Sequence, residues 1–208
     1  MRATPQRRRQ NRSRVTRERL VASGFGLFAE VGFDAVTVDD VCSAAGVAKG
    51  TFYFHFDSKE ALLVAAFHQG GGALLELAEA LVASNVSFDV AVLSLGERVA
   101  AATSPHPKAL VRRATVAALA AIDLERPPDG AQARRAAFGL VVESAIRAGD
   151  VAAGFRPDEI TMALNWSMLQ ALLVWSAQPG ERPSLATVMR RSLLLALGGV
   201  RQRNPEPG

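Results

Sequence analysis

The apolar and polar residues between positions 37 and 62 follow a pattern that predicts short helices in close succession. Thr37 stands just before the first apolar residue, and Asp40 follows at the spacing of a capping box, which marks a helix start. The residues that then share one apolar helix face are Val38, Val41, Cys42 and Ala45. Gly46 follows them directly and can adopt the left-handed backbone that ends a helix, so we expect a sharp turn there.

A second short helix with two chemically different faces follows this turn. One set of side chains can face inward: Val47, Thr51, Phe52 and Phe56. A basic and aromatic set can face outward: Lys49, Gly50, Tyr53 and His55. Two short helices joined by a glycine turn form a helix-turn-helix, and the second helix of that motif lies in the major groove of DNA.

The rest of the chain predicts an all-α fold. Segments rich in Ala, Leu, Glu and Arg alternate with clusters of Pro, Gly and Ser, and no segment shows sustained alternation of β-branched and polar residues. We expect nine helices at about 13–31, 38–45, 49–54, 58–83, 87–102, 107–122, 130–149, 157–177 and 184–200. The uncharged stretch 160–180 contains Asn and Gln in its middle, which favours a buried helix over a membrane span.

Charge is concentrated at the N-terminus. Residues 1–19 carry eight Arg against one acidic residue, whereas the whole chain has a net charge of only +4. A basic block on a nearly neutral body suggests an arm that contacts a polyanion, although a solvated, disordered terminus is an equal alternative for residues 1–11. The single cysteine, Cys42, fits a buried thiol in a reducing compartment, and no signal peptide follows the basic start.

The motif between residues 45 and 60 resembles a known family. Ala45-Gly46-Val47-Ala48-Lys49-Gly50-Thr51-Phe52-Tyr53-Phe54-His55-Phe56, followed by Ser58-Lys59-Glu60, is similar to the DNA-binding signature of TetR-family transcriptional regulators. The run 27–33 fits the end of that family's first helix. Ala48 departs from the usual Ser or Thr, so we expect the second short helix to lack a side-chain cap.

The resemblance implies an N-terminal helix-turn-helix domain and a larger helical domain that binds an effector and dimerises. The expected divisions are a disordered basic arm at 1–12, a DNA-binding domain at 13–57, a helical body at 58–200 and a tail at 201–208. Gly70-Gly71-Gly72 would cost about 3 kcal/mol inside a helix, so a break or kink is expected there. That break is either a simple loop or a hinge between the domains, and the family's use of this helix for coupling favours the hinge.

Chemistry and resemblance together assign the DNA contacts. Lys49 and Thr51 lie near the start of the second helix, where side chains reach base edges, and Gly50 lets the backbone approach. The residues suited to phosphate contact are Thr37, Tyr53, His55 and Lys59.

The resemblance also implies an effector pocket and a dimer interface in the body. Candidate pocket residues are Phe88, Phe138, Phe155, Met162, Trp166 and Met168, and the sequence shows no charged cluster that would indicate the polarity of the ligand. Candidate interface residues on the last two helices are Leu172, Trp175, Leu193 and Leu197. A single thick monomeric core is the alternative for these helices.

No catalytic constellation, metal-ligand spacing or cofactor motif is found in the sequence, so we expect no enzyme activity, no metal and no cofactor. We expect a cytoplasmic homodimer that binds a palindromic double-stranded DNA operator, does not associate with membranes, and represses transcription until an unknown small-molecule effector displaces it. An effector-independent architectural DNA-binding protein and a transcriptional activator are the alternatives.

Overall fold

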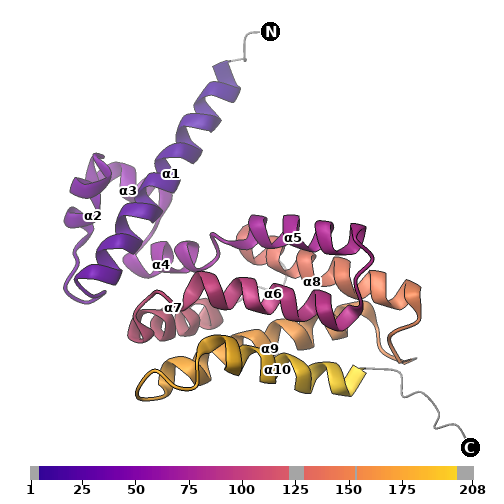
Figure 1. The fold of residues 1–208 in the computed structure, drawn as a ribbon. Coiled ribbons are helices and arrows are strands. Elements are labelled where there is room, and N and C mark those ends of the chain that lie inside the picture. Colours follow the sequence, from indigo (N-terminus) through magenta and orange to yellow (C-terminus); the bar gives the residue numbers. More distant parts are fainter. Residues whose placement is uncertain (1–4, 122–128, 153, 201–208) are drawn as a thin grey trace, which may run out of the picture.

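The computed structural model describes residues 5–121, 129–152 and 154–200, which form ten α-helices and no strand. Figure 1 shows α1, α2 and α3 grouped at one side of the molecule and α5 to α10 stacked at the other. In chain order the helices are α1 (Pro5–Glu30), α2 (Val38–Ala45), α3 (Lys49–His55), α4 (Lys59–Phe67), α5 (Gly71–Ala83), α6 (Phe88–Thr103), α7 (Lys108–Ala120), α8 (Asp129–Ala148), α9 (Pro157–Ala177) and α10 (Leu185–Val200). The expected all-α fold with an N-terminal helix-turn-helix domain is confirmed.

The first helix is longer than the sequence predicts. It begins at Pro5 rather than at residue 13, so residues 5–12 of the arm that we expected to be disordered continue the helix. Pro is tolerated in the first turn of a helix, and no further Pro or Gly follows it until residue 24. Figure 1 shows the start of α1 projecting beyond α2 and α3.

The N-terminal helices enclose a core of their own. Leu20, Phe28, Phe52 and Leu62 are fully buried there and come from α1, α3 and α4. Leu110 and Ala114 of α7 belong to the same cluster, so the body contributes one helix to the core of the DNA-binding domain. Since α4 also packs into this core, the change from one domain to the other comes after α4 and not before it.

The expected break in the predicted helix 58–83 is confirmed, and it has a packing cause. Helix α4 ends at Phe67 and α5 starts at Gly71. A Cβ atom on Gly71 would collide with the carbonyl group of Gly130 at the start of α8, and a Cβ atom on Gly130 would collide with the carbonyl group of His68. Only glycine at both positions permits this close crossing of α5 and α8.

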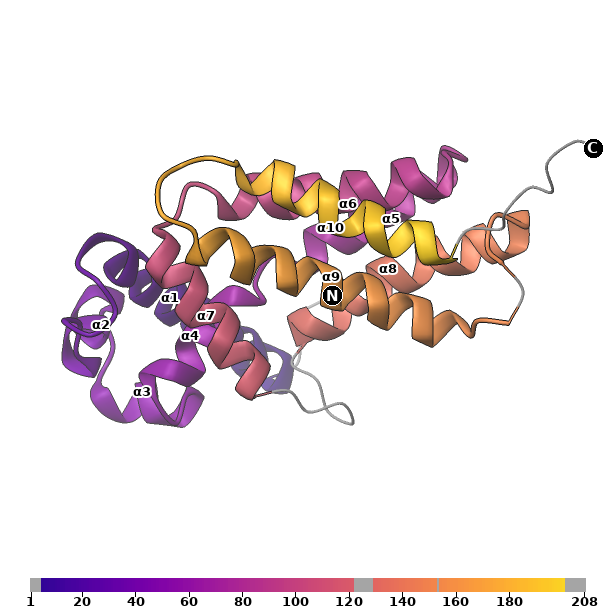
Figure 2. The ribbon, with the colours of Figure 1, turned by 90° about the horizontal axis from the view of Figure 1, so that it is seen from below.

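The body is a stack of α5, α6, α8, α9 and α10 around a second core. Its largest fully buried side chains include Leu95, Phe138, Leu164 and Met168. Figure 2 shows α9 running alongside α10, with α7 at the end that faces the N-terminal domain. By length and composition the stretch Lys59–Ala83 and helix α9 could each cross a membrane, but half of the apolar part of α9 is buried within this chain. That burial is what a soluble core helix shows.

Replacing Gly71 by Ala is expected to lower the free energy of unfolding by about 1–3 kcal/mol, because the added methyl group has no room against α8. Gly72→Ala is the matched control: its Cβ would meet no atom within 4 Å, so the substitution should be neutral or stabilise the protein by a few tenths of a kcal/mol. Urea unfolding of both variants measures the difference. Equal stability of the two variants would mean that α5 and α8 do not cross as described.

Candidate functional site

The helix-turn-helix is built from the cap and turn residues that the sequence predicts. The Thr37 backbone N–H donates to Asp40 Oδ2 at 2.8 Å, and the Asp40 N–H donates to the Thr37 hydroxyl oxygen at 3.2 Å, which completes the capping box of α2. Gly46 has a φ of 63° and ends α2 in the left-handed conformation. Ala48 precedes α3 without a side-chain cap, as expected.

The outer face of α3 presents polar and aromatic groups to solvent. The Lys49 ammonium forms an ion pair with Asp39 Oδ2 at 3.0 Å, and this hydrogen bond raises the pKa of Lys49 above its ordinary value. Tyr53 is half exposed, and no atom surrounds the position of a Cβ on Gly50. Thr51 is only partly exposed. A DNA contact by Lys49 therefore competes with its ion pair to Asp39.

Two aromatic residues at the end of α3 differ in their exposure. His55 is partly buried, and burial together with the nearby Arg17 lowers its pKa below the ordinary value. Phe54 is 74% exposed and was not among the expected DNA contacts. The sequence signal for it was an aromatic residue between outward-facing neighbours, and such a ring can contact thymine methyl groups or sugars.

Lys59 and Thr37, which we expect to contact phosphate, both make hydrogen bonds within the DNA-binding domain. The Lys59 ammonium donates to the carbonyl oxygens of Phe33 at 3.0 Å and Val36 at 2.6 Å, and it lies 4.6 Å from the Phe33 ring centroid. It therefore fastens the α1–α2 connection to α4. The Thr37 hydroxyl donates to Asp40 Oδ2 at 2.6 Å, and the N–H groups of Asp40 and Val41 are also bonded, which leaves the backbone N–H groups of Val38 and Asp39 available to a phosphate.

Polar and aromatic contacts join the DNA-binding domain to α7 and to the α6–α7 connection. The Arg113 guanidinium of α7 pairs with Asp34 at 2.9 Å and lies 4.1 Å from the centroid of the Phe33 ring. The Phe25 ring of α1 meets the His106 ring edge to face, with centroids 4.8 Å apart. A displacement of α7 and of the α6–α7 connection would therefore also move the segment that precedes α2 and α1, respectively.

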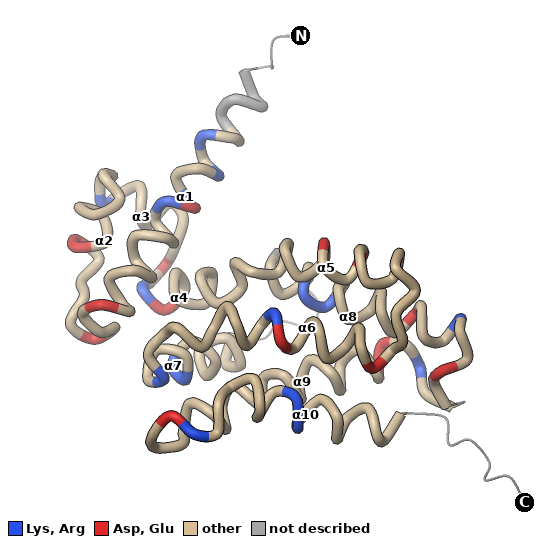
Figure 3. Tube along the Cα trace, in the orientation of Figure 1, with Lys and Arg blue, Asp and Glu red and all other residues tan. Residues whose placement is uncertain are grey.

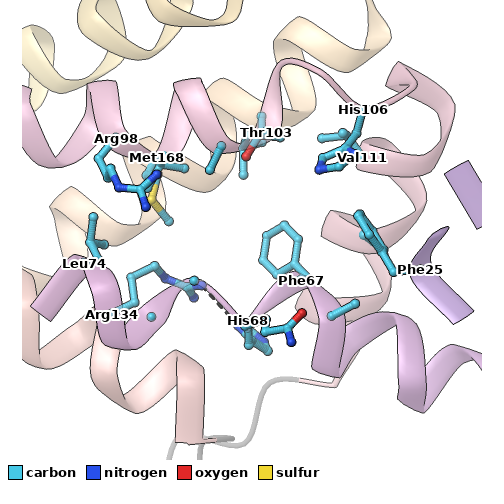
Figure 4. A pocket seen from close by; sticks show the side chains of 18 residues that line it. Phe25, Phe67, His68, Leu74, Arg98, Thr103, His106, Val111, Arg134 and Met168 are labelled. Carbon is cyan, nitrogen blue, oxygen red and sulfur yellow. Dashed lines mark hydrogen bonds between the residues drawn. The ribbon is translucent and has the colours of Figure 1, made fainter. Parts of the chain in front are cut away.

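A cavity of about 340 Å³ lies at this junction of the two domains. Its walls come from α1, α4, α5, α6, α7, α8 and α9 and from the turn between α4 and α5, as Figure 4 shows for the labelled residues. Apolar lining residues include Phe25, Phe67, Leu74, Val111, Met168 and Leu172. Two guanidinium and two imidazole groups also line it, namely those of Arg98, Arg134, His68 and His106, together with the amide of Gln69.

The contact between His68 and Arg134 is the main polar feature of the cavity. Arg134 Nη1 lies 3.1 Å from His68 Nδ1, the interaction drawn as a dashed line in Figure 4. Burial and the neighbouring Arg134 lower the pKa of His68 from 6.5 to about 4, so the imidazole is neutral at pH 7 and accepts the hydrogen bond through Nδ1. Burial lowers the pKa of Arg134 to about 10, which leaves it protonated.

Only one of the expected pocket residues, Met168, lines this cavity. Phe138 is fully buried in the body core, and Phe88 borders a smaller cavity of about 190 Å³ between the α5–α6 connection and α8. Phe155 and Trp166 are exposed, and Met162 is partly exposed. No sequence pattern predicted Arg98, Arg134, His68 and His106, because they belong to separate segments that only the fold brings together.

The expected interface residues are also placed differently. Leu172, Trp175, Leu193 and Leu197 are buried within the core of a single chain, because α9 packs on most of its circumference. The large apolar residues of α9 and α10 that remain exposed are Trp166, Val174, Leu194 and Leu195. After the first turn of α9, all its exposed residues are uncharged: Ala163, Trp166, Gln170, Val174 and Ala177.

Cys42 is buried in the N-terminal core, and burial raises the pKa of its thiol. Within the ranges that the structure describes, no group of three or more His, Cys, Asp and Glu side chains could hold a metal ion.

Comparisons with known proteins agree with this architecture. Residues 20–66 match the family model described as bacterial regulatory proteins, tetR family. Over 50 residues the chain is 48% identical to the uncharacterized HTH-type transcriptional regulator YerO of Bacillus subtilis (strain 168), which covers 24% of this chain and 17% of YerO. Over 46 residues it is 33% identical to IcaR, the negative transcriptional regulator of the biofilm operon icaADBC in Staphylococcus aureus (strain Newman), which covers 22% of this chain and 25% of IcaR. These matches therefore span a quarter or less of the curated relatives.

The likeness to solved structures extends over almost the whole chain. FadR of Thermus thermophilus, a TetR-family transcriptional repressor crystallised in complex with lauroyl-CoA, superposes with a TM-score of 0.69 at 27% identity. The superposition covers 92% of this chain and 99% of FadR. The matching helix-turn-helix and the shared two-domain helical fold show that this chain belongs to the TetR family of bacterial transcriptional regulators.

Proposed function

We propose that this protein is a ligand-responsive transcriptional repressor that binds a palindromic operator as a homodimer. The observation that carries the proposal is the position of the cavity, whose walls include Phe25 of α1 and Phe67 of α4 as well as helices of the body. A ligand there touches the DNA-binding domain directly. An architectural protein without an effector would have no use for a cavity between its two domains.

The proposed DNA surface is the outer face of α3 together with the basic part of α1. Lys49, Tyr53 and the exposed Phe54 face outward on α3. Figure 3 shows basic positions along the described part of α1, where Arg12 and Arg14 are exposed. These arginines suit phosphate contacts, which supply affinity without reading sequence.

A dimer places two α3 helices on one face of the duplex when its half-sites are about one turn, or a multiple of it, apart. The exposed uncharged stripe of α9 and the neighbouring Leu194 and Leu195 of α10 are the surface that we propose for dimerisation. A stripe without charge is expected at the centre of an interface, where charged residues are depleted.

Ligand binding can weaken DNA binding through the contact that joins α1 to the α6–α7 connection. Any ligand that changes the distance between Phe25 and His106 also changes how α1 packs on the body. A ligand shifts this equilibrium only if it binds one arrangement better than the other. A coupling free energy of about 1–3 kcal/mol would change operator affinity about 5–150-fold. In this scheme the α4–α5 break is the hinge, because it lies in the cavity wall between the two domains.

The comparisons support repression over activation only by analogy. IcaR is named a negative regulator, and FadR of Thermus thermophilus is described as a repressor. The activator alternative predicts the same DNA surface, so it is separated from repression by transcription assays and not by binding. Membership of this family also supports a cytoplasmic protein that acts on DNA and not as an enzyme, with no membrane partner.

Lys49→Ala is expected to relax base preference at one operator position by about 1–3 kcal/mol, since a direct base contact would be lost. Selection of bound sequences from random duplex DNA, followed by titration of single-base variants, measures this change. Asp39→Ala is the control: it frees Lys49 from its ion pair and should leave the base preference intact. Tyr53→Phe should weaken binding to all operator sequences alike if the hydroxyl group contacts phosphate. If Lys49→Ala keeps the base preference of the wild type at every operator position, Lys49 does not contact a base.

Trp166→Glu combined with Leu195→Glu is expected to give monomers in sedimentation equilibrium, because charge in an apolar interface lacks a partner. Leu195 is 82% exposed, so the substitution does not disturb the protomer core. Val31→Glu changes an exposed apolar residue beyond the end of α1 and should remain dimeric. A double variant that dimerises as well as the control would place the interface elsewhere.

The stability of the protein should fall as the pH decreases from about 6.5 to about 4, in part because of His68. In this range the unfolded chain binds a proton at His68 that the folded chain excludes, and the difference corresponds to about 3 kcal/mol when complete. Asn can accept the Arg134 hydrogen bond without titrating, so His68→Asn should lose less stability than the wild type over the same range. Urea unfolding at both ends of the range tests this, and parallel losses in the two proteins would contradict it.

A further inference from the structure

We propose that the cavity between the two domains binds a small organic anion, whose carboxylate or phosphate group pairs with Arg134 and whose apolar part lies against Phe67 and Met168. This inference rests on the proposed function, because it names the chemical class of the effector.

Arg134 carries a positive charge that no acidic side chain among the described residues neutralises. Its side chain is mostly buried, and its two hydrogen-bonding partners are both neutral: His68 Nδ1 at 3.1 Å from Nη1, and Asn165 Oδ1 at 3.3 Å from Nε. None of the ion pairs between described residues includes Arg134. A guanidinium group has five N–H donors, so further donors remain for a ligand.

The unpaired guanidinium group of Arg134 costs free energy in this position. A buried charge that lacks a counter-charge is unfavourable, and proteins normally pair it. The fork of N–H groups on arginine matches the two oxygens of a carboxylate or the oxygens of a phosphate, and such bidentate pairs are among the strongest hydrogen bonds. An anion in the cavity would therefore complete a site that the protein leaves open.

The other charged side chain that lines the cavity is also positive. Arg98 of α6 borders the same cavity from its exposed side, and it takes part in no ion pair of the described residues. Among the described lining residues there is no Asp or Glu. A cationic ligand would meet two arginines and no counter-charge, so the cavity selects against it.

Size and shape limit the rest of the ligand. A volume of about 340 Å³ is near the lower end of the range of about 300–1,000 Å³ for pockets that enclose drug-sized molecules. Figure 4 shows Arg98, Arg134, Leu74 and Met168 toward one end of the cavity, Phe67 in the middle, and Phe25, His106 and Val111 toward the other. An anion held at Arg134 thus extends its apolar body toward Phe25, the residue of the DNA-binding domain in the wall.

The test is calorimetric titration of the full chain with matched acid and alcohol probes, in the absence of DNA. Decanoate is compared with decanol, and naphthoate with naphthol, while decyl phosphate separates a phosphate preference from a carboxylate preference. We expect at least one acid to bind the wild type about tenfold to hundredfold more tightly than its alcohol, the range that a charge-assisted hydrogen bond supplies.

Arg134→Met should abolish this preference while the alcohol binds as before, which also shows that the variant is folded. Arg134→Lys keeps the charge without the fork and should retain part of the preference. Equal binding of acid and alcohol by the wild type, an intact preference in Arg134→Met, or no saturable binding of any acid would overturn the proposal. If an acid binds through Arg134 but leaves operator affinity unchanged, the anion site stands and the ligand-responsive function fails.

Discussion

The close crossing of α5 and α8 at Gly71 and Gly130 determines the geometry of everything between the two domains. Because neither position has room for a side chain, the carbonyl groups of His68 and Gly130 lie against the neighbouring backbone. This contact fixes the turn after α4, and it brings Arg134, one turn further along α8, to the imidazole of His68. The break in the chain and the polar group of the cavity therefore have one cause, which is backbone packing.

Helix α7 is the element through which the two domains are joined. It contributes Leu110 and Ala114 to the N-terminal core, and its Arg113 pairs with Asp34 next to Phe33. Phe33 lies between the cations of Lys59 and Arg113, so the segment before α2 is attached to both α4 and α7. Exposed ion pairs contribute little free energy, but the apolar contacts of Leu110 and Ala114 are buried and resist separation. The DNA-binding domain is thus attached firmly at α7, which also lines the cavity through Val111 and Ala114.

Local features of the sequence were sufficient to predict the helix-turn-helix but not the cavity. The capping box at Thr37, the left-handed turn at Gly46 and the absent cap at Ala48 depend on neighbouring residues, and all three occur as expected. The positions of Lys59, Phe88 and Phe138 depend on packing between distant segments. Periodicity shows that Leu172 and Leu193 are apolar, but it cannot tell a core face from a partner face. Likewise, four basic groups from separate parts of the chain form no pattern in the sequence.

The mostly buried Arg134 links the proposed anion site to the proposed response of DNA binding to a ligand. Among the described residues its charge meets the dipoles of a neutral imidazole and an amide and the face of the Phe67 ring, 5.9 Å away, but no acidic side chain. A mostly buried charge without a counter-charge is electrostatically unfavourable. An anion would remove that cost in whichever arrangement of α4 and α5 lets it reach the guanidinium group. Since the relief is available only in that arrangement, it is the differential affinity that a conformational shift requires. The proposed anion site would therefore influence how α1 and α3 are oriented toward DNA without contacting the DNA itself.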